Sequence, residues 1–174
     1  MDRPRFVPMP LVGYPERIAA ALWSLEDTRT RTLEGLDEVD PTWLDVVVPG
    51  STNTIAGLLY HVAAIELDWL YSEILESDDY PSDIVALFPD DVRDDQGQLV
   101  RAAGEPVENH LGRLAVVRTH FLSRMREIDA GDFTRERSLE SYDVTPEWVI
   151  HHLSQHEAEH RGQIGEIATR LGSS

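Results

Sequence analysis

The sequence contains no cysteine among its 174 residues, which excludes disulfides, thiolate metal sites and a cysteine nucleophile. It also contains no lysine, so all 15 basic residues are arginine. Against 32 acidic residues they leave a formal net charge of -17. This acidic excess repels phosphate backbones and anionic lipid, and no basic stripe offsets it locally. We therefore expect no nucleic-acid partner and no membrane partner.

Long hydrophobic runs are absent as well. No stretch approaches the ~20 apolar residues that span a membrane. The N-terminal MDRPRFVPMPLVGY has no apolar core of signal-peptide length. We expect a soluble cytoplasmic protein that forms one domain over residues 1–174, a length that allows a substantial core.

Four segments carry apolar residues at the alternating steps of three and four that are typical of amphipathic helices. They run over Tyr14–Leu36, Ser51–Ser77, Pro106–Ile128 and Thr145–Gly172. The valine run at 46–48 is too isolated to found a sheet, and the polar stretch 129–144 leaves room for one extended piece. Four helices without a convincing strand pair predict an all-α fold. The expected architecture is a four-helix bundle with a long crossover connection between the second and third helices.

The connection over 78–104 is broken by Pro81, Pro89, Gly97 and Gly104 and carries acidic clusters. A connection of this length is uncommon inside a domain and is often functional. Two interpretations stay open. The segment covers a pocket, or it is simply a disordered stretch or a crossover that lets two helices run parallel; the second is the plainer interpretation.

The last helix carries the main functional signal. Thr145 is its expected N-cap, Pro146 its first residue and Gly172 its end. Its apolar stripe is interrupted in the middle by His156 and His160. Two histidines four residues apart on one helix face project their imidazoles side by side, which is the arrangement that grips one metal ion.

A third metal ligand has to come from another part of the chain. His156 to His160 matches the zinc-protease pattern H-E-x-x-H, but only 14 residues follow His160 and none is histidine. His61 is the one histidine on a predicted inward face of another helix. Three imidazoles without a carboxylate or thiolate leave positions open for water, the pattern of a reactive metal site.

The remaining candidates have weaker signals. His152 lies one turn before His156 on the same helix face. It either hydrogen-bonds a metal ligand or lies nearer the end of the bundle, whereas His151 should face away. His110 and His120 are interpreted as surface or core residues. Glu157 is offset from His156 by about 100° around the helix. It is either a general base or a solvated carboxylate.

The small polar residues that precede the second helix, His61 followed by Glu66 and Trp69 within it, and the run His156–Ile164 (HEAEHRGQI) together resemble the DinB superfamily. That superfamily was named for DNA-damage-inducible proteins and includes YfiT-like bacillithiol transferases and mycothiol-dependent maleylpyruvate isomerases. The resemblance implies a homodimeric four-helix bundle with one divalent ion, zinc or nickel, on His61, His156 and His160.

Three functions are compatible with this resemblance. The first is a metal-dependent transferase that moves a low-molecular-weight thiol of the bacillithiol or mycothiol type onto a small electrophilic substrate. The second is a metal-dependent hydrolase with Glu157 or Glu66 as base. The third is a non-catalytic metal-binding protein of the stress response.

In the terminal motif, Gly162 is expected to allow close approach of a helix, and Arg161 and Gln163 to anchor the connection or line the far side of the bundle.

Overall fold

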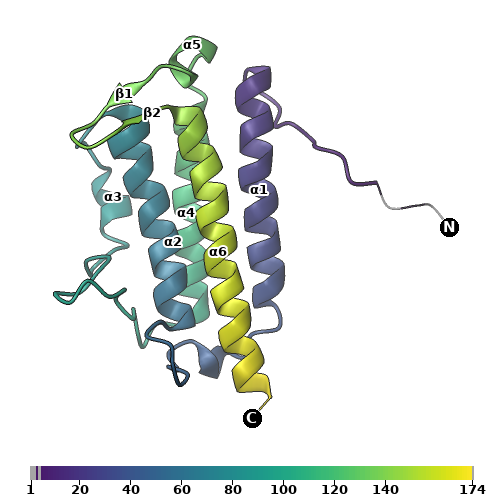
Figure 1. The fold of residues 1–174 in the computed structure, drawn as a ribbon, viewed down its shortest axis with the longest axis vertical. Helices are drawn as coiled ribbons and strands as arrows, with labels where there is room; N and C mark the ends of the chain where they lie inside the picture. Colours follow the sequence, from purple (N-terminus) through teal and green to yellow (C-terminus); the bar gives the residue numbers. More distant parts are fainter. Residues whose placement is uncertain (1–2, 4, 174) are drawn as a thin grey trace.

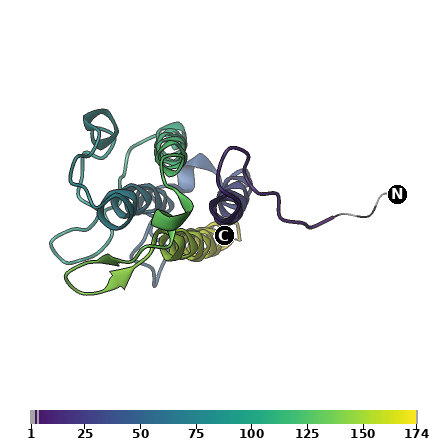
Figure 2. The ribbon, with the colours of Figure 1, turned by 90° about the horizontal axis from the view of Figure 1, so that it is seen from above.

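Four long helices build the body of the protein (Figure 1). The structure is a computed structural model that describes residue 3 and residues 5–173. The long helices are α1 (Glu16–Leu36), α2 (Ile55–Trp69), α4 (Val107–Met125) and α6 (Pro146–Gly172). Seen from above, they stand at the corners of a four-sided bundle (Figure 2). The predicted all-α bundle is confirmed.

Short elements join these helices. A 3-10 turn, η1 (Pro41–Trp43), lies at the lower end of the bundle, and a π-helical stretch, η2 (Leu70–Leu75), prolongs α2 (Figure 1). The other short elements are α3 (Ser82–Val85), α5 (Ala130–Phe133), β1 (Arg137–Ser138) and β2 (Asp143–Val144). The two strands pair antiparallel, with Arg137 opposite Val144 and Ser138 opposite Asp143. This small hairpin is the extended piece for which 129–144 left room.

The connection over 78–104 is a crossover that returns to the start of α2, so that α2 and α4 run parallel (Figure 1). Thr54 Oγ1, at the N-terminus of α2, donates a hydrogen bond to the carbonyl of Arg101 at 3.2 Å. The amide of Gly104 donates to Asp45 Oδ2 at 2.9 Å. These contacts fix the far end of the connection beside α2, which confirms the crossover interpretation.

Apolar side chains from all four long helices fill the interior. The core includes Leu22, Leu58, Leu59, Phe121, Leu153 and Ile164, and none of them is more than 4 % exposed. α6 packs against α1 on one side and against α2 on the other, and α2 also packs against α4. Along the described residues, no helix combines the length and the apolar character that crossing a bilayer requires.

Several element ends differ from the predicted ones. α2 begins after Thr54, whose Oγ1 accepts the amide of Gly57 at 3.0 Å, rather than after Ser51. The Ser51 hydroxyl instead accepts the amide of Asn53 within a turn. α4 ends at Met125 rather than Ile128. On α1, Leu33 is 40 % exposed, because the buried line continues through Arg29 and Thr32.

Candidate metal centre

The two histidines of α6 lie side by side, as their spacing predicts. Thr145 caps the helix by accepting the amide of Trp148 at 3.2 Å, and Pro146 occupies its first turn. One turn apart on the same helix, His156 and His160 bring their Nε2 atoms to 3.0 Å. Both residues are half-buried, so the pair lies between the core and the surface of the bundle.

His61 of α2 closes the cluster from the neighbouring helix. Its Nε2 lies 3.0 Å from His156 Nε2, and its ring is 4 % exposed. One ligand atom from each of the three histidines lies within 4.8 Å of the others. The structure therefore brings together the three residues that the sequence predicts as ligands. No carboxylate belongs to this cluster in the described part of the chain.

Burial makes these imidazoles poor bases. Burial, followed by the charges of neighbouring groups, lowers the pKa of His61 to about 4 and that of His156 to about 3. Burial also lowers the pKa of His160, although the contact of that residue with Gln163 partly opposes the shift. All three side chains are neutral near pH 7, which is the protonation state that a metal ligand needs.

The donor set fits a divalent transition metal. With Zn–N bonds of ~2.0–2.1 Å, two nitrogens 3.0 Å apart subtend about 90° at one ion. His160 directs Nδ1 towards Gln163 Oε1 at 3.4 Å, and Asn53 Nδ2 donates to the same oxygen at 3.3 Å. Such a contact orients a ligating ring. Three neutral imidazoles suit zinc, nickel and related ions and leave further coordination positions open.

A comparison with models of protein families matches the DinB superfamily over residues 24–164, most of the chain. The chain belongs to the DinB superfamily. All three histidines lie inside the matched range, and the resemblance carried by the terminal HEAEHRGQI run is confirmed. A search among curated proteins found no match.

Glu157 does not face the histidines of this DinB protein. The side chain is 2 % exposed and points into the bundle interior, where Arg29 Nε donates to Oε1 at 2.7 Å. Arg118 Nη2 donates to Oε2 at 3.2 Å. The expectation of a solvated carboxylate is wrong, because Glu157 lies on the core-facing side of α6, four residues after the buried Leu153. Both oxygens of the proposed general base are occupied by guanidinium groups.

Glu66, the other candidate base, belongs to the same buried network. Its Oε2 accepts from Arg29 Nη2 at 2.8 Å, and its two oxygens accept from Arg118 Nε and Nη2 at 2.7 and 2.8 Å. Arg118 also donates to Glu26 Oε1 at 2.6 Å. The network joins one residue or more from each long helix. We call Arg29, Glu66, Arg118 and Glu157 the buried quartet.

The two arginines of the buried quartet were not identified from the sequence, although a signal for them exists. Arg29 follows Leu25 by four residues and Leu22 by seven, and Arg118 follows Leu114 by four and precedes Phe121 by three. Both therefore stand on the apolar lines of their helices, as His61 does on α2. The reasoning that singled out the histidines applies equally to these arginines.

An aromatic row continues from the histidine cluster towards the end of α6. His152 stacks on Trp69 of α2, with ring centroids 4.3 Å apart, and on Trp148 at 5.1 Å. The His152 ring lies 6.0 Å from that of His156. Beyond it, half-exposed Trp148 lines a cavity of about 340 Å³ that Tyr142 and Val144 also line. His152 thus belongs to an aromatic surface beside the cluster.

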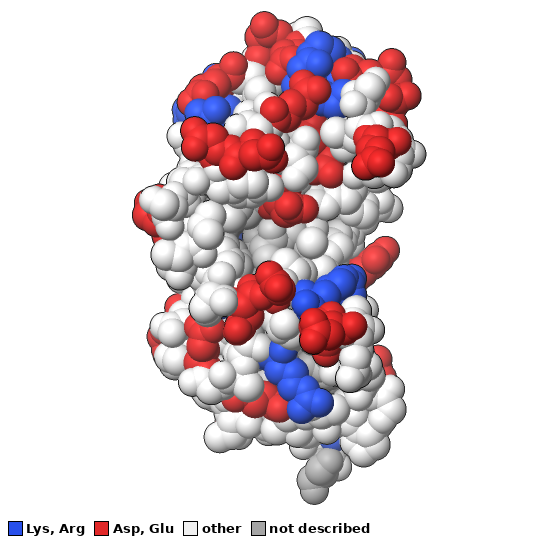
Figure 3. Space-filling model, turned by 90° about the vertical axis from the view of Figure 1, so that its left-hand side faces the viewer, with Lys and Arg blue, Asp and Glu red and all other residues white. Residues whose placement is uncertain are grey.

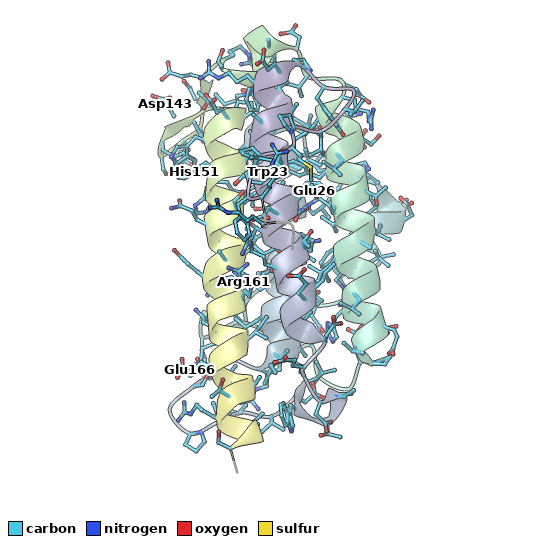
Figure 4. The ribbon with its side chains drawn as sticks, turned by 90° about the vertical axis from the view of Figure 1, so that its right-hand side faces the viewer. Trp23, Glu26, Asp143, His151, Arg161 and Glu166 are labelled. Carbon is cyan, nitrogen blue, oxygen red and sulfur yellow. The ribbon has the colours of Figure 1, made fainter. Side chains whose placement is uncertain are left out.

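The remaining predicted residues have structural positions. Gly162 is exposed and a Cβ there would meet nothing within 4 Å, so the expected close helix approach is wrong. His151 and Arg161 lie on α6 on the face seen in Figure 4. His151 is exposed, as predicted. His110 is fully buried beside Arg113, whereas His120 is half-buried and contacts the hydroxyl of Tyr71 at 2.9 Å.

Proposed function

We propose that this DinB-superfamily protein binds one divalent ion, zinc or nickel, through His61, His156 and His160. We further propose that it is a metal-dependent transferase, which moves a low-molecular-weight thiol onto a small electrophilic substrate. The observation that carries the proposal is the convergence of three neutral imidazoles, with ligand atoms within 4.8 Å of one another and no carboxylate among them. Such a neutral ligand set does not offset the charge of the ion, and it leaves coordination positions open for a substrate.

The chemistry follows from this ligand set. A divalent ion held by the three histidines would lower the pKa of a thiol that binds it, as such ions do for water. The chain contains no cysteine, so the sulfur nucleophile has to arrive with a small molecule. The thiol loses its proton to solvent, the sulfur–carbon bond forms, and the leaving group departs from the electrophile with the bonding electron pair.

The chain's own residues would hold the two substrates. The three histidines would hold the ion that the sulfur binds, and they are buried or half-buried, which limits the access of bulk water. Trp69, His152 and Trp148 offer stacked faces beside that place. A flat aromatic electrophile gains offset-stacking contacts there, which are worth about 0.5–1.5 kcal/mol per pair.

A conjugation assay tests the proposal. Zinc- or nickel-loaded protein is incubated with bacillithiol or mycothiol and 1-chloro-2,4-dinitrobenzene, and the thioether is followed by its absorbance. We expect the wild type and the exposed-site control His151→Ala to form product, and His156→Ala to lose this activity. Equal rates in wild type and His156→Ala with every thiol would refute the transferase.

Two other functions remain as outcomes of this assay. Thiol-independent ester or amide hydrolysis that depends on the histidines would indicate the hydrolase, although the pairing of Glu66 and Glu157 with arginines provides no support for either as its base. Bound metal without any turnover would indicate a non-catalytic metal-binding protein. The homodimer expected for this superfamily stays a prediction.

A further inference from the structure

The crossover connection is fastened to α2 on both sides of the turn that carries Arg93. Before the turn, the Tyr60 hydroxyl donates to the carbonyl of Asp90, and the Asp90 amide donates back to that hydroxyl at 3.1 Å. After the turn, the carbonyl of Val100 lies so near Gly57 that a Cβ there would come within 2.5 Å of it. Tyr60 directly precedes the candidate ligand His61. The connection is therefore held next to the histidine cluster.

The turn itself is ordered by local hydrogen bonds. The amide of Asp94 donates to the carbonyl of Gln98 at 2.8 Å, and Asp94 Oδ1 accepts the amides of Gln96 and Gln98 at 2.9 Å. Gly97 supplies the positive φ of 76° that closes the turn. Arg93 bridges to Leu99 across its base. A fixed backbone lowers the entropic cost of presenting this arginine to a ligand.

The guanidinium of Arg93 is nearly free of protein partners. Arg93 is exposed, and Nη1 donates to the carbonyl of Gly97 at 2.8 Å. Within the described part of the chain this is its one hydrogen bond, and it forms no ion pair there. A guanidinium carries five N–H donors, so four are available to a ligand.

The backbone of Arg93 lies beside the part of α2 that carries His61. Arg93 follows Asp90, which is bonded to Tyr60, by three residues, a chain length of at most about 11 Å. Tyr60 directly precedes His61 in α2. The docked connection therefore holds Arg93 on the side of α2 that faces the candidate metal centre.

The face that carries the connection is shown in Figure 3. A largely uncharged, recessed band crosses the middle of that face, and acidic and arginine side chains lie both above and below it.

We propose that Arg93 is the anion-binding residue of the metal centre and holds a carboxylate of one of the two substrates by charge-assisted hydrogen bonds. The proposal rests on the transferase function and narrows it to substrates that carry a carboxylate as well as the reacting sulfur or carbon. A planar guanidinium binds a carboxylate through two parallel N–H···O bonds, which fixes the orientation of the substrate as well as its affinity.

Binding to zinc-loaded protein, measured by isothermal titration calorimetry, tests this role. The probes are mercaptosuccinate, which has a thiol and two carboxylates, 1-thioglycerol, which has a thiol alone, and succinate, which has carboxylates alone. We expect Arg93→Ala to weaken the binding of mercaptosuccinate by about tenfold or more, the usual effect of losing a charged hydrogen bond. The affinity of Arg93→Ala for 1-thioglycerol should stay within about twofold of the wild-type affinity, because this probe lacks a carboxylate.

Arg101 provides a matched control. It lies on the same connection and is exposed, and its carbonyl accepts a hydrogen bond from Thr54, which precedes His61 by seven residues. Arg101→Ala should leave the affinity for all three probes unchanged. This result would exclude a general effect of net charge. Arg93→Lys should recover part of the affinity for mercaptosuccinate, because the charge returns without the bidentate geometry.

The outcomes separate this inference from the proposed function. If wild type binds zinc but neither thiol, the transferase is refuted, and succinate alone then decides whether Arg93 binds carboxylates. Equal affinities of wild type and Arg93→Ala for both succinate and mercaptosuccinate would overturn the inference, as would an equal loss for thioglycerol. In turnover, a higher KM for mercaptosuccinate in Arg93→Ala places the carboxylate on the thiol. A higher KM for 4-chloro-3-nitrobenzoate places it on the electrophile.

Discussion

Glu157 illustrates how a single side chain acquires its role from what surrounds it. It directly follows His156 in the sequence, yet its carboxylate is shared between Arg29 and Arg118 in the bundle interior. Two guanidinium groups and two carboxylates of the buried quartet compensate one another where water does not reach. Removing one member leaves the others with uncompensated charge.

We predict that Glu157→Gln lowers the free energy of unfolding by about 3 kcal/mol, because the amide nitrogen of glutamine turns a donor towards arginine donors. Urea unfolding of zinc-loaded protein measures this effect. Glu159→Gln, an exposed carboxylate on the same helix, is the control and should change little. Unchanged stability in Glu157→Gln, together with loss of a thiol-independent hydrolysis, would instead make Glu157 a base.

His110 is a second residue whose burial has a measurable consequence. It is 0 % exposed, and burial together with the charge of Arg113 lowers its pKa from 6.5. Below pH 6.5 the unfolded chain therefore binds a proton at this residue that the folded chain does not. The stability of the folded state falls as the pH falls through this range, until the lowered pKa is reached.

We predict that wild type loses more of its free energy of unfolding than His110→Gln does when the pH falls from 6.5 to about 5.5. Glutamine keeps an acceptor for Arg113 and does not titrate. Urea unfolding of the two metal-free proteins at both ends of that pH interval gives the difference, in which the contributions of the other histidines cancel. Parallel stability profiles would show that His110 is protonated equally in the folded and unfolded chains.

At the scale of elements, the crossover connection is built into the fold rather than attached to it. Its return arm passes the first turn of α2 at Gly57, where the Val100 carbonyl and the Arg101 Cα occupy the space of a side chain. The missing Cβ lets two backbone segments meet. The docking of the connection, and with it the position of Arg93, depends on this contact.

We predict that Gly57→Ala destabilises the protein by about 1–3 kcal/mol, because the added methyl group overpacks this contact. Gly112→Ala is the matched control. Gly112 also lies in a helix, but nothing lies within 4 Å of its missing Cβ, so alanine there should stabilise by about 0.5–1 kcal/mol. Urea unfolding and limited proteolysis of 78–104 report the two effects. Equal behaviour of the variants would show that the connection does not dock on α2.

The sequence predicts the elements of this fold better than their ends. Apolar spacing locates all four long helices. The predicted N-cap of α6 at Thr145 is also correct, since its side chain accepts the amide of Trp148. The start of α2 is missed because Ser51 and Thr54 are both residue types that commonly cap helices. In the structure Ser51 lies in a turn with Asn53, whereas Thr54 contacts the carbonyl of Arg101. The π-helical end of α2, with Glu76 at φ 51°, has no signal in the spacing.

The candidate metal centre is predictable for a different reason. Histidines on apolar helix faces are conspicuous, and a bundle allows few pairings between faces, so His61 follows from His156 and His160. Arg93 is not predictable in this way. It lies on an irregular connection, and contacts at Tyr60 and Gly57, distant in sequence from it, bring it to the cluster.

On the scale of the whole molecule, the bundle arranges charge in three ways. The surface is acidic, the buried quartet ties all four long helices together through paired charges, and the histidine cluster is neutral. Interior pairs are screened far less than surface charges. Through Arg29 and Arg118 the quartet links Glu66 of α2 to Glu157 of α6, close in sequence to His61 and His156.

The metal content of the purified protein tests the central claim most directly. Wild type, His61→Ala, His160→Ala and the exposed-site control His151→Ala are loaded with zinc, desalted and measured by mass spectrometry of the metal. We predict about one zinc per chain in wild type and His151→Ala. His61→Ala and His160→Ala, each reduced to two ligands, should retain little zinc. Full zinc content in His61→Ala would contradict a metal centre shared between α2 and α6.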